Sequence, residues 1–281
     1  MCHLGQTSVL TVDAIKGSET PAKWTLKNHE LPENDLVSQQ PTTEPDLDLN
    51  VQITGASRGL GLEFVRQLSE QGHKVIAAAR SPEKSSELQA FATKKNIHTL
   101  SLDIVDEASV NSAADKVSKI APEGIDILIN NSGVLCSYSL NVETVKAKDY
   151  MRIFETNVAG TATTTVAFLE HLRKRKTRKI INISSSLGSI GYPKDIGTSA
   201  PAYSVSKAGE NMLSKLFSVQ LEKENFIVLA LHPGWVKTDM GTGRAPLEPI
   251  ESISGMLKVI ENLTTEDNGK FLDYQGQPMP W

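Results

Sequence analysis

Two side chains that can pass a proton between them stand four residues apart in the stretch "YSVSK", at 203 to 207. The surrounding "AYSVSKAGENMLSKLFSVQLEKE" has helical periodicity, so Tyr203 and Lys207 should share one helix face, with Cβ atoms about 5 to 6 Å apart. An ammonium ~4 Å from a phenol stabilises the phenolate by on the order of 4 kcal/mol at an effective dielectric near 20. Since that is roughly three pKa units, the spacing predicts a tyrosine whose pKa falls toward neutrality and that works as a general acid or base. On an exposed surface helix the same spacing would carry no chemistry.

A second candidate site is the glycine-rich stretch "TGASRGLG" at 54 to 61, which follows an apolar run and precedes a helical pattern. Glycine lets the backbone turn sharply and approach a pyrophosphate, whose charge then lies at a helix N-terminus. The stretch therefore predicts a dinucleotide-binding loop, although glycines between a strand and a helix can also simply form a turn. Its expected contact residues are Gly55, Ser57, Arg58, Gly59, Leu60 and Gly61.

The residues after the second apolar run indicate which dinucleotide the loop would bind. NAD-binding sites usually place an acid at the end of the second strand to hold the ribose 2′-hydroxyl. This chain has Ala79 there and Arg80 beside it, while Arg58 projects from the glycine loop. Two guanidinium groups suit a 2′-phosphate, so NADP(H) is favoured over NAD(H). The alternative is that both arginines are solvated loop residues.

Six apolar runs that read as buried strands alternate with amphipathic stretches of helix length. They are "VQIT", "KVIAAA", "HTLSLD", "IDILIN", "KIINIS" and "IVLALH", beginning at residues 51, 74, 98, 125, 179 and 227. This alternation predicts an α/β chain with a single-domain Rossmann fold, in which helices flank a doubly wound parallel sheet of about seven strands. Ligands of such sheets bind at the carboxyl ends of the strands.

The first 48 residues have a different composition from the rest. Prolines at 21, 32, 41 and 45 interrupt them, and "QQPTTEPDLD" is polar and acidic, as in a linker. We expect residues 1–48 to be a poorly ordered N-terminal extension, with "SVLTVDAI" at 8 to 15 as a candidate strand, and residues 49–281 to form the catalytic domain.

Composition excludes several other classes of protein. The net charge of −4 gives no electrostatic case for nucleic acid, and the basic run "RKRKTRK" at 173 to 179 suits the C-terminal end of a helix. Two cysteines do not make a disulfide framework, and no residue pattern suggests a metal site. There is no apolar run of roughly 20 residues that would cross a membrane and no targeting presequence pattern. A cytoplasmic location is the expectation.

Taken together, the motifs resemble the classical short-chain dehydrogenase/reductase family, over residues 51 to 281. They occur in the family's order: "TGASRGLG" at 54, "LDI" at 102, "NNSG" at 130, "NVAG" at 157, "NISSS" at 182, "YSVSK" at 203 and "HPGWVKTDMG" at 232. The ending "GKFLDYQGQPMPW" is similar to the sniffer and C-factor branch of carbonyl-reductase-like members.

The resemblance implies a catalytic set of four residues. Tyr203 would protonate a carbonyl oxygen as hydride arrives, and Lys207 would lower its pKa and hold the nicotinamide ribose. Ser185 would orient the substrate oxygen, although Ser184 and Ser186 are adjacent hydroxyls. Asn157 would hold a water in a proton relay, or else satisfy helix backbone.

The resemblance also implies cofactor contacts outside the glycine loop. Asp103 would meet the adenine, and Asn130 would line the adenosine ribose side and stabilise the sheet. Val236 and Thr238 would approach the nicotinamide carboxamide. Substrate selection is expected from Cys136 and its neighbours, the loop from 187 to 201 and the segment from 240 to 252.

The implied function is an NADP(H)-dependent oxidoreductase that interconverts a ketone or aldehyde and its alcohol. The alternative from another class is a catalytically weak NADP(H)-binding regulatory or signalling protein of the C-factor type. An epimerase or dehydratase is disfavoured because such relatives have longer C-terminal substrate domains and a different glycine spacing. The resemblance further implies a homodimer or homotetramer formed through the long helices beside the fifth strand.

One residue conflicts with the expected fold. Gln52 interrupts the apolar first strand, which should lie centrally in the sheet. Burial of an amide without hydrogen-bond partners costs a few kcal/mol.

Overall fold

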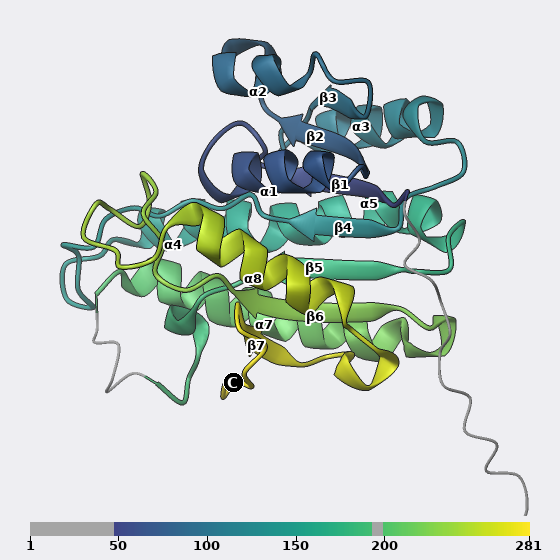
Figure 1. The fold of residues 1–281 in the computed structure, drawn as a ribbon. Coiled ribbons are helices and arrows are strands. Elements are labelled where there is room, and N and C mark those ends of the chain that lie inside the picture. Colours follow the sequence, from purple (N-terminus) through teal and green to yellow (C-terminus); the bar gives the residue numbers. More distant parts are fainter. Residues whose placement is uncertain (1–47, 193–198) are drawn as a thin grey trace, which may run out of the picture. The chain divides into compact units, whose positions relative to one another are not determined.

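The computed structural model describes residues 48–192 and 199–281 and contains one seven-stranded parallel sheet. Three of the expected segments lie outside these residues, wholly or in part: the candidate strand at 8–15, most of the extension over 1–48, and part of the expected substrate loop. The strand order is β3-β2-β1-β4-β5-β6-β7 (Figure 1). The strands β2 and β3 are therefore added on one side of β1, and β4 and the later strands are added on its other side. The strands are β1 (Asn50–Thr54), β2 (Lys74–Ala79), β3 (Ile97–Ser101), β4 (Ile127–Asn130), β5 (Lys179–Ile183), β6 (Ile227–His232) and β7 (Phe271–Asp273).

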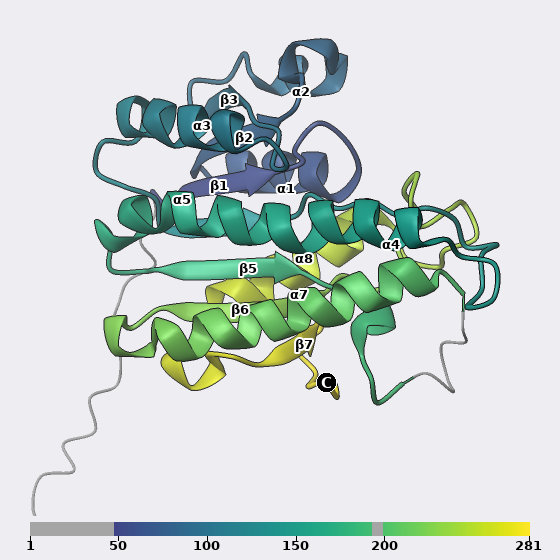
Figure 2. The same ribbon diagram turned by 180° about the vertical axis from the view of Figure 1, so that it is seen from behind.

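Helices cover both faces of the sheet, which confirms the doubly wound α/β architecture (Figures 1 and 2). They are α1 (Gly59–Glu70), α2 (Ser86–Phe91), α3 (Glu107–Ile120), α4 (Ala147–Phe154), α5 (Thr161–Arg173), α7 (Pro201–Gln220) and α8 (Pro249–Glu261). Short helical turns join them: η1 (Pro82–Lys84), the π-helix η2 (Glu155–Gly160), η3 (Ser186–Gly188), η4 (Glu222–Glu224) and η5 (Thr265–Asp267).

Two apolar clusters, one on each face of the sheet, hold the helices against the strands. There are two because alternate strand residues point to opposite faces of the sheet. On one face, Phe64 of α1 and Met256 of α8 pack against β-strand residues such as Val51. On the other, Phe168 of α5 packs with Leu128 and the apolar side of α3. Strands buried on both faces explain why the sequence shows nearly continuous apolar runs.

Gln52 is the exception within this core. Its side chain is fully buried in β1, and neither its nitrogen nor its oxygen has a hydrogen-bond partner among the described residues. The conflict that the sequence indicated is therefore present in the fold.

The basic run ends a helix, as predicted. α5 stops at Arg173, whose guanidinium pairs with Glu170 and Glu224. Arg178 donates to backbone carbonyls, including that of Glu224. These contacts bind the cations into the turn before β5.

No helix among the described residues is long and apolar enough to cross a bilayer. The described part of the chain likewise contains no group of three or more His, Cys, Asp or Glu side chains placed to hold a metal ion.

Candidate active site

The glycine loop lies between the end of β1 and the start of α1, at the carboxyl edge of the sheet. Gly55 has φ +67°, a conformation that favours glycine. A Cβ on Gly61 would stand 2.3 Å from the Gly55 carbonyl oxygen, so a larger residue does not fit there. The loop therefore has the compact form that a backbone needs to approach a phosphate closely.

The first turn of α1 carries no acidic side chain that would compete with an anionic ligand. The residue before the helix, Arg58, makes no capping hydrogen bond with its side chain, and the first turn contains no acidic residue. Its backbone N–H groups and the positive end of the helix dipole thus remain available to an anionic ligand. A dinucleotide pyrophosphate fits this site. Ser57 is tied to the next crossover because its carbonyl accepts from Ser85 Oγ at 2.8 Å, and Leu60 packs on the core.

Asn131, the first residue after β4, contacts the glycine loop, and the sequence did not predict this role. Its Nδ2 donates to the carbonyls of Thr54 (2.8 Å) and Gly55 (3.2 Å), and its own N–H donates to Thr54 Oγ1. It therefore fixes the glycine loop from the end of β4. The motif "NNSG" was a signal for it, because two consecutive amides follow a buried strand.

The end of β2 has the composition that the sequence indicated. Ala79 is the last strand residue and is buried, and Arg80 after it is exposed. Arg58 is also exposed, but its guanidinium pairs with Asp239 at 3.1 Å. Arg58 therefore pairs with Asp239 and, among the described residues, makes no ion pair or hydrogen bond that would hold it beside Arg80. Because the ion pair of Arg58 with Asp239 lies on the surface, it is weak, and a phosphate group can displace it.

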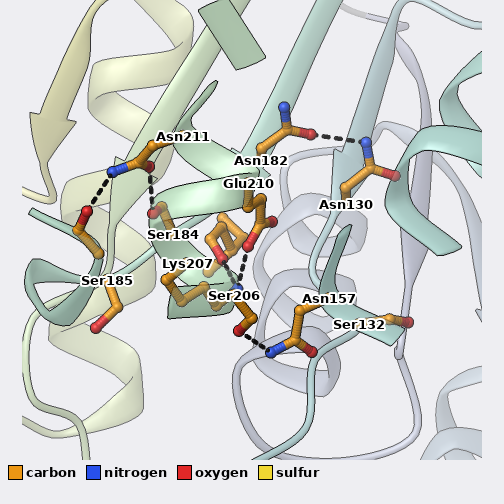
Figure 3. Close-up of polar contacts among 12 residues, drawn as sticks. Asn130, Ser132, Asn157, Asn182, Ser184, Ser185, Ser206, Lys207, Glu210 and Asn211 are labelled. Atoms are coloured by element: carbon orange, nitrogen blue, oxygen red, sulfur yellow. Dashed lines mark hydrogen bonds and ion pairs between the residues drawn. The ribbon is translucent and has the colours of Figure 1, made fainter. Parts of the chain in front are cut away.

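Asp103, just after β3, and Asn130, the last residue of β4, differ in their surroundings. Asp103 follows β3 and is partly exposed, so it can meet a ligand. Asn130 is buried, and its Nδ2 donates to Asn182 Oδ1 at 2.8 Å (Figure 3). It also donates to Thr165 Oγ1 at 2.9 Å. These contacts with β5 and α5 support its expected role in the sheet, and its expected place beside the adenosine ribose stays a prediction.

The segment after β6 approaches the glycine loop. A Cβ on Gly59 would lie 3.6 Å from Thr238 Cγ2, so the two segments are neighbours. Thr238 Oγ1 accepts from Gly241 N at 3.0 Å, and Val236 is buried and forms a β-bridge with Leu247. Thr238 therefore stands beside the loop expected to hold the pyrophosphate, and Val236 lies two residues before it in the same segment.

Tyr203 and Lys207 share the buried face of α7, as the spacing predicts. Lys207 Nζ lies 5.7 Å from the centroid of the Tyr203 ring. It donates to the Ile183 carbonyl oxygen at 2.7 Å, which ties α7 to the carboxyl end of β5 (Figure 3). A Cβ on Gly188 would stand 2.7 Å from the Lys207 backbone, so this glycine lets η3 pack directly on α7.

Ser185 is the serine that reaches the tyrosine. Its hydroxyl hydrogen-bonds the Tyr203 phenol and accepts from Leu187 N at 3.2 Å. Ser184 is turned inward and bonds Asn211 Oδ1 at 2.6 Å. Ser186 is tied through its backbone N–H to His232. Among the three hydroxyls, the geometry favours Ser185.

The electrostatics correct one expectation. Burial raises the pKa of Tyr203 above its ordinary value, Lys207 and the Ser185 hydrogen bond act in the opposite direction, and Glu210 raises it further. The expected fall of the Tyr203 pKa toward neutrality is therefore wrong. The sequence argument counted the ammonium but neither desolvation nor a second, negative neighbour.

That neighbour, Glu210, was missed entirely. It lies one turn beyond Lys207, is fully buried, and its Oε2 accepts from Lys207 Nζ at 2.5 Å. An acid in "KAGENML" reads as solvent-facing from composition alone. Its separation of three from Lys207 and seven from Tyr203 was the available signal, since those positions share a helix face.

Asn157 lies in the π-helical turn η2 between α4 and α5. It is fully buried, and its side chain bonds both the N–H and the carbonyl of Val134 (2.8 and 3.0 Å) and also Ser206 Oγ (3.0 Å). These contacts fix the segment after β4 against α7. The side chain therefore satisfies backbone groups of the segment after β4, and not helix backbone as the alternative expected, while its expected role of holding a water stays a prediction.

A third apolar cluster surrounds Tyr203. The side chains packed around it come from the segment after β4, from α4, η3 and the loop after β6: Val134, Leu135, Cys136, Val145, Tyr150, Leu187 and Met240. The expected pocket residues Cys136 and Met240 are thus placed beside the candidate acid, while residues 193–198 of the expected loop lie outside the described part.

Comparison with known proteins gives a consistent result. Residues 50–248 match the family model described as short chain dehydrogenase. The carbonyl reductase Sniffer of D. melanogaster is 31% identical with a TM-score of 0.78, over 83% of this chain and 99% of that one. An NADPH-bound carbonyl reductase from chicken fatty liver is 34% identical with a TM-score of 0.77, over 83% and 98%. The C-signal protein of Myxococcus xanthus is 41% identical over 157 residues, which cover 56% of this chain and 93% of that one.

Proposed function

The chain belongs to the short-chain dehydrogenase family, and on this premise we propose that it is an NADP(H)-dependent oxidoreductase that interconverts a small ketone or aldehyde and the corresponding alcohol. The observation that carries the proposal is the meeting of Tyr203, Lys207 and Ser185 in one buried group. It lies at the same sheet edge as a glycine loop shaped for a pyrophosphate.

Each residue of the group has a distinct task. Tyr203 gives its proton to the carbonyl oxygen during reduction and takes it back during oxidation. The Ser185 hydroxyl, held by η3, orients the same oxygen and stabilises charge on it. Lys207 offers the cofactor ribose the N–H that Ile183 and Glu210 leave free. Asn157 holds the segment that forms the opposite wall. The bound nicotinamide supplies the hydride.

The choice of cofactor rests on charge at the end of β2. Ala79 leaves no carboxylate to hold a ribose 2′-hydroxyl, and the exposed Arg80 and Arg58 can hold a 2′-phosphate. The NADPH bound by the carbonyl reductase from chicken fatty liver agrees with this choice.

The substrate should be small and largely apolar, because the side chains of the cluster that contains Tyr203 are aliphatic, sulfur-containing or, in Tyr150, aromatic. We expect purified protein to oxidise NADPH in the presence of at least one member of a panel of aliphatic and aromatic ketones and aldehydes. The same panel with NADH should give a lower kcat/KM. Turnover with NADH but not NADPH would contradict the cofactor assignment.

The similarity to C-signal favours one second candidate, an NADP(H)-binding signalling protein with little turnover. The two functions differ in a simple measurement. A signalling protein would bind NADPH, seen as fluorescence quenching, yet fail to oxidise it with any carbonyl compound of the panel.

A further inference from the structure

The buried carboxylate of Glu210 is a charged group of the site that the proposed reaction does not use. It is fully buried on α7, and its Oε1 has no hydrogen-bond partner among the described residues. Its Oε2 accepts from Lys207 Nζ at 2.5 Å (Figure 3). Burial raises the pKa of Glu210 to about 7, and Lys207 acts in the opposite direction. A residue kept at this cost needs a reason.

Glu210 determines where the lysine head group can point. An ammonium has three N–H donors, of which one goes to the Ile183 carbonyl oxygen and one to Glu210. A Cβ on Gly133 would lie 3.7 Å from Lys207 Nζ and 3.6 Å from Asn157 Oδ1, so the head group faces the segment after β4. The carboxylate thus helps to leave a single donor for a ligand.

Glu210 also changes the charge around the tyrosine. Without it, Tyr203 would face one buried cation, which favours the phenolate. With it, the cation is shared with a second anion, and this carboxylate raises the pKa of Tyr203. A protonated tyrosine is the form that carbonyl reduction needs, while alcohol oxidation needs the phenolate.

We propose that Glu210 is a positioning residue that holds the Lys207 ammonium and opposes negative charge on Tyr203, so that the site stays loaded with its proton for carbonyl reduction and alcohol oxidation is confined to more alkaline solution. The inference rests on the proposed oxidoreductase function and adds the pH range in which each direction runs. The equilibrium constant of the reaction is unchanged.

Other titratable groups near α7 do not take this role. Tyr138, in the segment after β4, interacts with Tyr203 as a neutral phenol whose own pKa is raised by burial. His232 at the end of β6 faces Ser186, and burial lowers its pKa to about 4, so it is neutral. The charged residues of the packed elements α4, η2 and η4 are exposed or half-buried: Lys148, Asp149, Arg152, Glu155, Glu222, Lys223 and Glu224.

The test compares pH profiles of kcat/KM for NADPH-dependent reduction and NADP-dependent oxidation in the wild type and in Glu210→Gln. Glutamine keeps the shape and an acceptor for Lys207 but removes the charge. Both profiles should move to lower pH, by on the order of one pH unit, the size commonly produced by one neighbouring charge. Oxidation measured at pH 8, where the wild-type Glu210 carboxyl is ionised because its pKa is about 7, should rise correspondingly, by roughly tenfold.

Two variants control the comparison. Glu210→Asp keeps the charge and should retain a profile close to that of the wild type, and Glu222→Gln removes an exposed glutamate at the far end of α7 and should change nothing. If Glu210→Gln does not fold, Glu210→Leu replaces it, and the same shift is required. Unmoved midpoints, even with lower activity or stability, would reduce Glu210 to a structural residue and overturn the proposal. Absence of any wild-type turnover would instead contradict the proposed function.

Discussion

The site contains a buried group whose members shift the pKa values of Tyr203 and Lys207 in opposite directions. The group consists of Tyr203, Lys207, Ser185 and Glu210. Burial raises the pKa of Tyr203, and Glu210 adds to that, while the ammonium and the Ser185 hydroxyl lower it. The same burial would lower the pKa of Lys207, yet Glu210 and Tyr203 raise it above its ordinary value. The lysine therefore remains a cation throughout the neutral range, and the tyrosine is protonated there, as the proposed reduction requires.

Ser185 should contribute to turnover and little to cofactor binding. Ser185→Ala removes the hydroxyl that bonds the phenol and that would bond the substrate oxygen. We expect kcat to fall by about 100-fold, the usual cost of one donor to a developing oxyanion, with an unchanged dissociation constant for NADPH. Ser186→Ala is the matched control, because its backbone N–H and not its hydroxyl makes the recorded contact with His232. Equal losses in the two variants would contradict the assignment of Ser185.

Residue types alone determined part of this group. The spacing of four residues on a helix predicted that Tyr203 and Lys207 lie side by side, and the structure places Lys207 Nζ close to the Tyr203 ring. The sequence did not predict the roles of Glu210 and Asn131, because the burial of a single polar residue depends on how the whole fold packs. Asn130 was placed after the correct strand, but the direction of its side chain depends on Asn182 and Thr165, which are 52 and 35 residues away.

The elements position these residues through close backbone approaches. Gly188 lets η3 rest on α7 beside Lys207, and Gly61 lets α1 start against the Gly55 carbonyl. The apolar runs predicted the strands well because a parallel sheet is buried on both faces. Strand ends were less predictable: β3 stops at Ser101 and β4 starts at Ile127, although Leu102 and Ile125 beyond them are equally buried.

Gly61 should be the most demanding position of the phosphate loop. In Gly61→Ala the new Cβ would lie 2.3 Å from the Gly55 carbonyl and 2.6 Å from Asn131 Nδ2. The loop has to shift, which we expect to cost about 1–3 kcal/mol of unfolding free energy and to weaken NADPH binding by at least about tenfold, since 1.4 kcal/mol is a factor of ten. Thermal unfolding and fluorescence titration measure the two effects.

Gly243→Ala is the control for that substitution. A Cβ at Gly243 meets no atom within 4 Å, so stability and affinity should match those of the wild type. If Gly61→Ala behaved like Gly243→Ala, the close approach of α1 to the end of β1 would not be what shapes the phosphate site.

At the scale of the whole molecule, exposed apolar side chains follow one side of α7. They are Val205, Met212, Leu216 and Val219, each more than half exposed, and Val166 on α5 is also exposed. Both helices lie in front of the sheet in Figure 2. Apolar side chains grouped in this way indicate an interface and agree with the homodimer or homotetramer implied by the family resemblance. The cytoplasmic location and the domain boundary after residue 48 stay predictions.

Leu216→Glu tests that interface. Leu216 is 60% exposed, so the substitution should leave the monomer folded while a carboxylate opposes apolar contact. We expect the wild type to sediment as a dimer or tetramer and the variant as a monomer. Val142→Glu, on an equally exposed residue of the segment after β4, should retain the wild-type mass. A monomeric wild type would contradict the interface.

The most direct test of the proposed function is NADPH oxidation by Tyr203→Phe with a carbonyl substrate that the wild type reduces. Phenylalanine keeps the ring beside Lys207 and removes only the hydroxyl group that carries the proton. The account predicts a loss of kcat of at least about 100-fold, as expected for removal of a general acid, with the NADPH dissociation constant and the thermal midpoint retained. A variant that reduced the same substrate at the wild-type rate would contradict it.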